Sequence, residues 1–160
     1  MSESKKDINW YLNIIVALIA ILAFFGIKEC NDIRFSKKLN GMYRMTYYFK
    51  DCTYRKYVDG ELECYYDINF STIGNGIRGE GFKHSETFEG NYKRYSKNFA
   101  IEIIGSRTGK EVVAKTFEDN SAQNKKVEGT IRINLKTMKG IFNVGFQNCA
   151  GEIKIEKLEY

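Results

Sequence analysis

An uncharged apolar run near the N-terminus constrains the architecture of this chain more than any other feature. Residues 10–27 read WYLNIIVALIAILAFFGI and contain no Asp, Glu, Lys or Arg. With two further residues the run forms a helix of about 30 Å, the thickness of a bilayer core. Trp10 and Tyr11 stand where aromatic side chains meet lipid headgroups. We therefore predict four segments: an N-terminal tail at 1–7, a transmembrane helix at 8–28, a basic linker at 29–40 and a β domain at 41–160.

The residues that flank this run predict an uncleaved anchor and its orientation. A secretory signal has a shorter apolar core and a small-residue cleavage site, and neither is present. Positive residues are more numerous after the run, at Lys28, Arg34, Lys37 and Lys38, than before it, at Lys5 and Lys6. Because positively charged flanks stay in the cytoplasm, the charges predict a single-pass protein whose C-terminal domain is cytoplasmic.

One face of the apolar helix carries Asn13, Ala17 and Ala20, spaced at i, i+4 and i+7. Small residues let two helices approach closely, and an Asn amide in hydrocarbon seeks a partner amide. This face therefore predicts self-association of the helix. The alternative is that Asn13, which lies about one turn inside the membrane, contacts lipid headgroups.

The remainder of the chain alternates between apolar and polar residues with the period of a β-strand. It is rich in aromatic residues and glycine, with 11 Tyr, 11 Phe and 14 Gly in the whole chain and no Pro. The clearest alternating runs lie at 43–49, 62–70 and 127–135, and turn signals occur at 59–60 and 74–76. No amphipathic helix follows the anchor. These features predict a mainly β fold of eight to ten antiparallel strands.

The short connections between these strands favour an up-and-down β-barrel. A meander of hairpins closes when its first and last strands pair, which removes the exposed edges of the sheet. A β-sandwich is the alternative for such a set of strands. An eight-stranded barrel has an interior that is either filled by side chains or wide enough for one small ligand.

The chain has four cysteines, Cys30, Cys52, Cys64 and Cys149. A two-residue turn at 59–60 places Cys64 opposite Arg55, so that Cys52 and Cys64 are too far apart to form a disulfide. We therefore expect reduced thiols in a cytoplasmic domain.

Motifs for metal binding or catalysis are absent from the sequence. There is no CxxC pair, and His84 is the only histidine, which we expect in a surface loop. No nucleophile elbow, zinc-protease motif or phosphate-binding loop occurs. We expect a protein that is not an enzyme and that holds no cofactor or metal.

Candidate ligand-binding residues are charged residues that alternate in phase with aromatic ones. Arg78 and Glu80 share a strand face with Phe82, and Arg94 shares one with Tyr92. If the aromatic side chains point inward, the charged ones do too, and a buried arginine needs an anionic partner. That partner is either Glu80 or a phosphate or carboxylate group of a ligand, whose base could stack on tyrosine. The candidates are Arg78, Glu80, Tyr92 and Arg94.

The order of segments resembles a known family. A short N-terminal membrane region, a basic linker and a compact β-barrel resemble the membrane-anchored β-barrel effectors of bacterial cyclic-oligonucleotide anti-phage signalling (CBASS). GTIRINLKTMKGIFNVGF, residues 129–146, resembles the glycine-bearing hairpin of that family, and LNGMYRMTYY, residues 39–48, resembles its first strand. Those effectors commonly carry two transmembrane segments, whereas this chain has one.

The resemblance implies an inner-membrane effector whose cytoplasmic barrel binds a cyclic di- or oligonucleotide, forms homo-oligomers and disrupts the bilayer. Because Asp and Glu are interleaved with Lys and Arg throughout the chain, we expect no DNA or RNA partner. A membrane-tethered lipocalin-like carrier of a small ligand is one alternative, and a phage or bacterial membrane interaction protein without a ligand is another. An inward Arg78 or Arg94 favours nucleotides, an apolar cavity favours a carrier, and a filled barrel with an exposed aromatic patch favours an interaction protein.

Overall fold

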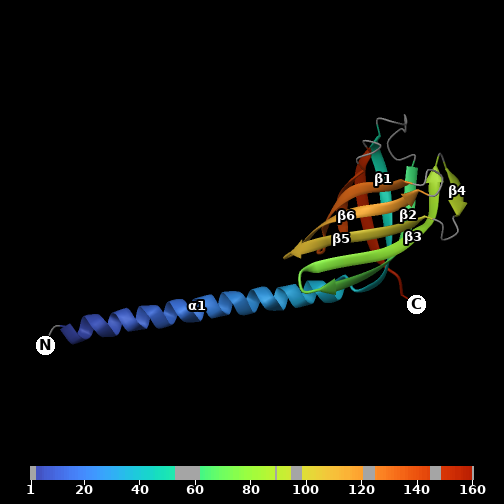
Figure 1. Ribbon diagram of the computed structural model, residues 1–160. Helices are drawn as coiled ribbons and strands as arrows, with labels where there is room; N and C mark the ends of the chain where they lie inside the picture. Colours follow the sequence, from blue (N-terminus) through green and yellow to red (C-terminus); the bar gives the residue numbers. More distant parts are fainter. Residues whose placement is uncertain are drawn as a thin grey trace. The chain divides into compact units, whose positions relative to one another are not determined.

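The computed structural model of this protein describes residues 3–52, 62–88, 90–94, 99–120, 125–144 and 149–159 (Figure 1). The chain divides into two units, Met1–Arg34 and Phe35–Tyr160. The described residues form one helix and nine strands, whose bounds are α1 (Glu3–Lys38), β1 (Gly41–Cys52), β2 (Leu62–Ile73), β3 (Gly76–Phe88), β4 (Asn91–Arg94), β5 (Ala100–Thr108), β6 (Glu111–Asn120), β7 (Lys125–Asn134), β8 (Lys139–Val144) and β9 (Cys149–Lys157).

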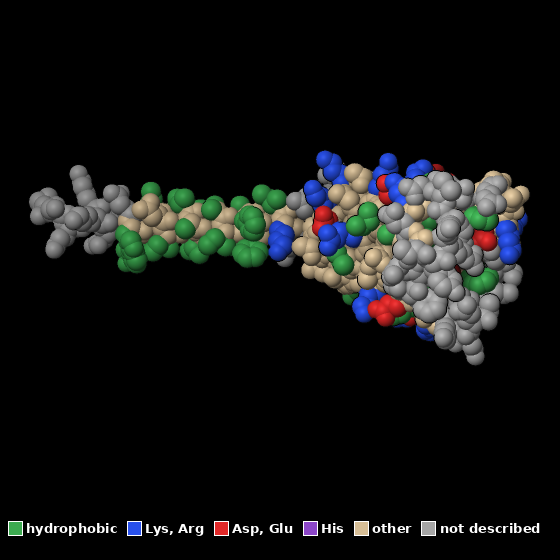
Figure 2. All heavy atoms as spheres, turned by 90° about the horizontal axis from the view of Figure 1, so that it is seen from above, with side chains coloured by type: hydrophobic (Ala, Val, Ile, Leu, Met, Phe, Trp, Pro, Cys, Tyr) green, Lys and Arg blue, Asp and Glu red, His purple; other side chains and the backbone are tan. Residues whose placement is uncertain are grey.

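The N-terminal unit is helical throughout its described part. Within α1 the segment Trp10–Lys28 is long and apolar enough to cross a membrane, and its side chains are exposed. Hydrophobic side chains cover the visible face of this segment in Figure 2. A signal sequence near an N-terminus has the same properties. The helix is therefore consistent with either a membrane anchor or a signal sequence. The expected linker, 29–40, is itself helical as far as Lys38.

The β domain is a closed antiparallel barrel of eight strands. Each strand pairs with its neighbour along the chain, except that β3 pairs with both β4 and β5. The barrel closes because β1 also pairs with the last strand, β9, and Figure 1 shows these two strands side by side. The short strand β4 lies beside β3 outside the barrel wall. The predicted mainly β, up-and-down barrel is confirmed.

Alternating apolar residues fill the interior of this barrel. The faces predicted to point inward in β1, β2 and β7 do so, and their buried members are Tyr43, Met45, Tyr47, Cys64, Tyr66, Ile68, Phe70, Ile131 and Ile133. Burying apolar area of this extent is the main source of stability for a domain of this size. Edge-to-face ring contacts, such as Tyr43 on Phe70 at 5.9 Å between centroids, add to it.

Glycines let β3 pack tightly on β2. A Cβ on Gly81 would lie 2.0 Å from the carbonyl oxygen of Asp67, and a Cβ on Gly79 would lie 2.8 Å from the Phe70 ring. These inward positions therefore require the absence of a side chain. The regular glycine spacing in β3 reflects close strand packing in a small barrel.

The structure corrects the expected register of the first hairpin and the state of two cysteines. Tyr47 lies opposite Cys64, where the turn at 59–60 predicted Arg55; residues 53–61, which include that turn, lie outside the described residues. Cys52 lies opposite Cys149 across the β1–β9 pair and forms a disulfide with it. The expectation that all cysteines are reduced is therefore wrong, whereas Cys30 and Cys64 are free thiols.

Candidate functional site

Arg78 and Glu80 lie on the outer surface of the barrel. Their side chains are 62% and 64% exposed, and the Arg78 guanidinium pairs with Glu80 at 2.9 Å and with Glu102 at 3.0 Å. They share a face with Phe82 as the sequence indicated, but that face points outward, because Ile77 and Gly79 take the inward positions. The prediction that these two charges point into the barrel is wrong.

Tyr92 and Arg94 also lie outside the barrel, on β4, and both are exposed. Hydrogen bonds to the side chains of Ser85 and Arg94 lower the pKa of Tyr92. β4 pairs with the second half of β3, at Ser85–Phe88, whereas Arg78 and Glu80 belong to its first half. The structure therefore does not bring the four predicted residues into one site.

An open depression of about 440 Å³ lies on the outer wall over β3, β5, β6 and β7. Two of the predicted residues, Arg78 and Glu80, contribute to its lining. Its basic side chains are Arg78 and Lys126, and its acidic side chains are Glu80, Glu102 and Asp119. Acidic groups therefore outnumber basic ones, and Arg78 is already paired with two of them.

A buried arginine does occur in the barrel, at a position other than the predicted ones. Arg107 alternates with Ile101 and Ile103 along β5 and is 4% exposed. It lies at the end of the barrel where β1 begins, and its backbone N–H donates to the carbonyl of Asn75 at 2.8 Å.

The opposite end of the barrel, where β1 finishes, has polar side chains at inward positions. We call this group the polar end; its members are Tyr47, Cys64, Tyr66, Lys83, Glu86, Thr116 and Glu118. Polar side chains inside a small barrel cost free energy unless they form hydrogen bonds or ion pairs. Their grouping at one end of the barrel therefore makes this end a candidate functional site.

A β-bulge in β3 places Lys83 and Glu86 on the same inward face. Tyr66 lies opposite Lys83 and Cys64 lies opposite Glu86, so that one residue of β3, His84, is extra in the register. Lys83 Nζ lies 2.7 Å from Glu86 Oε2, with side-chain exposures of 13% and 22%. His84 belongs to this strand and is partly buried, so its expected place in a surface loop is wrong.

Glu118 reaches the interior from β6. It follows Val112, Ala114 and Thr116 in strict alternation, and β6 continues to Asn120. The Tyr66 hydroxyl donates a hydrogen bond of 3.1 Å to Glu118 Oε2. Burial raises the pKa of Glu118, and the charge of Lys83 together with the Tyr66 hydrogen bond offset part of that effect.

Tyr47 is a buried residue of the polar end. The residue is 5% exposed, and its ring packs edge-on against Phe142 at 4.7 Å and Tyr66 at 5.1 Å between centroids. Its Oη has no hydrogen-bond partner among the described residues. Burial, with the nearby Glu118 carboxyl and Cys64 thiol, raises the pKa of Tyr47, so the hydroxyl keeps its proton.

The free thiol of Cys64 is not poised for catalysis. It is 2% exposed, and burial raises its pKa to about 12. The thiol therefore stays protonated at neutral pH, whereas a nucleophilic cysteine needs its thiolate. No cluster of three His, Cys, Asp or Glu residues with metal-binding geometry occurs in the described part of the chain.

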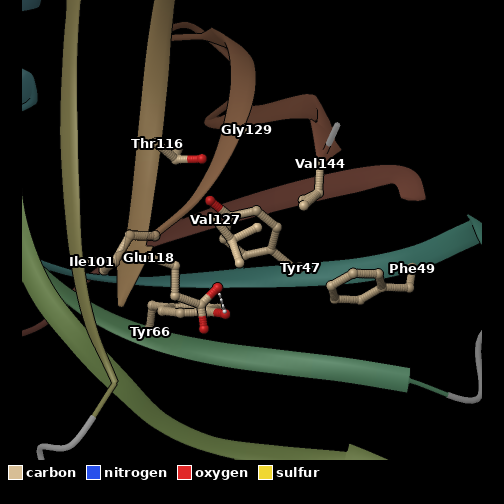
Figure 3. Close-up of a pocket in the computed structure, with 9 residues that line it drawn as sticks. All are labelled: Tyr47, Phe49, Tyr66, Ile101, Thr116, Glu118, Val127, Gly129 and Val144. Atoms are coloured by element: carbon tan, nitrogen blue, oxygen red, sulfur yellow. Dashed lines mark hydrogen bonds between the residues drawn. The ribbon is translucent and has the colours of Figure 1, made fainter. Parts of the chain in front are cut away.

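Tyr47, Tyr66 and Glu118 meet at a small cavity inside the polar end (Figure 3). Its volume is about 20 Å³, which is room for one water-sized group. The remaining lining residues are Phe49, Ile101, Thr116, Val127, Gly129 and Val144. Three aromatic rings, one carboxyl group and a hydroxyl without a partner therefore surround a space that is too small for a nucleotide.

Comparisons of the chain with protein-family models, curated proteins and solved structures give no match. The resemblance to the β-barrel effectors therefore rests on the apolar helix and the barrel architecture alone.

Proposed function

We propose that this protein is a membrane-tethered β-barrel that binds the polar head of a small ligand at the polar end. The observation that carries the proposal is the buried Tyr47 hydroxyl, which lacks a partner among the described residues and lines the same cavity as Glu118. This cavity lies inside the barrel, where a ligand group would be shielded from water.

The energetics of burial support a ligand at this place. A buried hydroxyl without a hydrogen bond costs about 1–3 kcal/mol relative to one that is paired. Phenylalanine at position 47 would fill the same space without that cost. A ligand group that hydrogen bonds to Tyr47 and Glu118 offsets the cost and explains why polar side chains occupy these positions.

Cyclic-nucleotide sensing is the second candidate, and one observation favours it. The outer depression contains Arg78, Glu80 and Lys126, and its volume of about 440 Å³ lies in the range of small-molecule sites. Its excess of acidic side chains disfavours a polyanion, so we rank this candidate below binding at the polar end.

The disulfide supports a barrel on the non-cytoplasmic side of the membrane. Disulfides persist in oxidising compartments and are rare in the cytosol. Cys52 and Cys149 therefore argue against the orientation that the flanking charges predict, which rests on an excess of two positive residues. We propose that the polar end meets its ligand outside the cytoplasm, where an anchored carrier or receptor domain encounters small solutes.

The test is saturation-transfer NMR on the full chain in detergent micelles, which detects weak binding. The probes are methylammonium, formate and formamide, three small polar groups of different charge, with a cyclic dinucleotide as the fourth. We expect at least one of the three small probes to bind, and Tyr47→Phe to weaken it by about threefold to tenfold, the loss of one hydrogen bond. The matched control is Tyr48→Phe on the outward face of the same strand. Absence of binding by all three small probes overturns the proposal.

A further inference from the structure

We infer that the ligand group that fits the polar end is a primary ammonium group, so that the ligand is a small amine. This inference rests on the proposed function and names the chemical class of its ligand. The feature behind it is the set of groups that surround the cavity: one part-buried carboxyl, two tyrosine hydroxyls, one threonine hydroxyl and three aromatic rings.

The hydrogen-bonding groups of the cavity suit a donor ligand. An ammonium group has three N–H donors and no acceptor. Glu118 Oε, Tyr47 Oη and Thr116 Oγ1 are all able to accept a hydrogen bond, and all three residues line the cavity. Figure 3 shows these side chains arranged around the same space, with the Tyr66 hydroxyl directed at the Glu118 carboxyl.

The charges of the polar end also favour a cation. Its acidic groups are Glu86 and Glu118, and its basic group is Lys83. Lys83 Nζ forms a salt bridge of 2.7 Å with Glu86 Oε2. The positive charge of Lys83 also acts to lower the pKa of Glu118, but burial, which raises it, has the larger effect. A ligand anion would lie beside the part-buried Glu118 carboxyl, whereas an ammonium would add a direct ion pair to that carboxyl.

The aromatic rings strengthen the preference. Tyr47, Phe49 and Tyr66 line the cavity, and the Tyr47 ring lies 5.1 Å from Tyr66 and 6.4 Å from Phe49 between centroids. Aromatic faces attract cations through their quadrupole, and they do so most strongly where water is excluded. The buried setting of Tyr47 and Tyr66 meets that condition.

The size of the cavity restricts the kind of ammonium. A space of about 20 Å³ admits one water-sized group. A primary ammonium head is of that size, while a quaternary ammonium carries methyl groups in place of the donors and is too large. Methylammonium and tetramethylammonium therefore form a pair of probes that separates hydrogen-bonded recognition from nonspecific attraction of cations.

The experiment measures binding of methylammonium, tetramethylammonium, formate and formamide to the full chain in detergent micelles. We expect methylammonium to bind best, and Glu118→Gln to weaken it by about tenfold or more, as for loss of a hydrogen bond to a charged group. The matched control is Glu128→Gln, which removes an exposed carboxylate on the outer wall that pairs with Lys115 at 2.6 Å. Glu128→Gln should leave binding unchanged.

The possible outcomes separate this inference from the proposed function. Binding of formate or formamide in preference to methylammonium, weakened by Tyr47→Phe, overturns the amine assignment and leaves the binding site in place. Equal binding of tetramethylammonium, or methylammonium binding unchanged by Glu118→Gln, overturns the assignment as well. Absence of binding by every probe overturns both. The wild-type comparison of the four probes needs no variant, so it decides the matter even if Glu118→Gln fails to fold.

Discussion

Cys52, the last residue of β1, and Cys149, the first residue of β9, face each other and form a disulfide across 97 positions of sequence. β1 and β9 are the pair that closes the barrel, so the bond joins the two ends of the meander. It lies at the same end of the barrel as Tyr47 and Glu118. The covalent link therefore joins β1, which carries Tyr47, to β9 at the end of the barrel that contains the proposed ligand site.

Removing this bond should destabilise the barrel. In the chain-entropy account a disulfide across a long loop contributes about 2–4 kcal/mol, because it restricts the unfolded chain. We expect Cys52→Ala/Cys149→Ala to lower the free energy of unfolding by about that amount, measured by urea titration with circular dichroism. The double variant should be insensitive to reductant, whereas Cys30→Ser should respond to reductant as the wild type does. Wild-type stability unaffected by reductant would contradict the prediction.

The free thiol of Cys30 reports the orientation of the chain. Cys30 is exposed and follows the apolar segment by two residues, while Cys64 is buried. If the barrel lies outside the cytoplasm, a membrane-impermeant maleimide should label intact spheroplasts that express the full chain. Cys30→Ser should abolish the labelling. Labelling that requires lysis of the cells would place the barrel in the cytoplasm, as the flanking charges indicate.

Replacing Tyr47 by phenylalanine should not harm the fold. The change removes a buried hydroxyl that has no hydrogen-bond partner among the described residues. In the absence of ligand we therefore expect the free energy of unfolding to stay the same or to increase by up to about 1 kcal/mol. Tyr66→Phe is the contrasting variant, because the Tyr66 hydroxyl donates to Glu118. It should destabilise the protein by about 1–2 kcal/mol. Equal losses in both variants would show that the Tyr47 hydroxyl is paired.

Glu118 should make stability depend on pH. Burial holds its pKa above the ordinary 4.5, against the opposing effects of Lys83 and Tyr66 and with Glu86 adding to the rise. A raised carboxyl pKa means that the folded state binds the proton more tightly than the unfolded chain does. Its stabilising contribution is therefore complete below pH 4.5 and is lost as the pH rises through the raised value.

The comparison of wild type with Glu118→Gln isolates this effect. Gln is neutral at every pH, so the stability of the wild type should fall relative to that of the variant as the pH increases above 4.5. Urea titrations at several pH values measure the difference, and Glu128→Gln serves as the exposed control. Parallel pH profiles for wild type and Glu118→Gln would contradict a raised pKa.

Self-association of the apolar helix stays a prediction of the sequence. Asn13, Ala17 and Ala20 lie on one face of α1, and all three are exposed. Asn13→Leu should weaken association by about 1 kcal/mol, measured by Förster transfer between labelled chains in lipid vesicles. Leu22→Ile, on the opposite face, should have no effect. Unchanged transfer in Asn13→Leu would favour the alternative contact with lipid headgroups.

The alternation of residues predicts the barrel well where the inward positions carry side chains. In β1, β2 and β7 the apolar residues themselves mark the interior. In β3 the inward positions include Gly79 and Gly81, which have no apolar side chain to mark the interior. The alternation therefore suggests the wrong face for the neighbouring Arg78 and Glu80. The bulge at His84 then changes the phase of the strand, and a strict two-residue period does not reveal it.

Two features of the candidate site differ in how far the sequence predicts them. Glu118 continues the alternation of Val112, Ala114 and Thr116, so a longer strand would have placed it in the interior. The Cys52–Cys149 bond depends on which strands are neighbours in three dimensions. Local turn signals do not contain that information, because the pairing of the first and last strands follows only from closure of the whole barrel.

Closure of the sheet would also matter if the apolar helix holds the domain at a membrane. Tethering confines neighbouring copies to two dimensions, where unpaired strands from different chains meet often and can join edge to edge. In the described part of this domain every barrel strand pairs with a strand on both sides, and the unpaired strand edge belongs to β4. That edge strand is four residues long and carries Lys93 and Arg94, whose positive charges disfavour pairing with the same strand of another copy. The exposed strand edge of the described domain is therefore short and positively charged, which disfavours edge-to-edge pairing between copies.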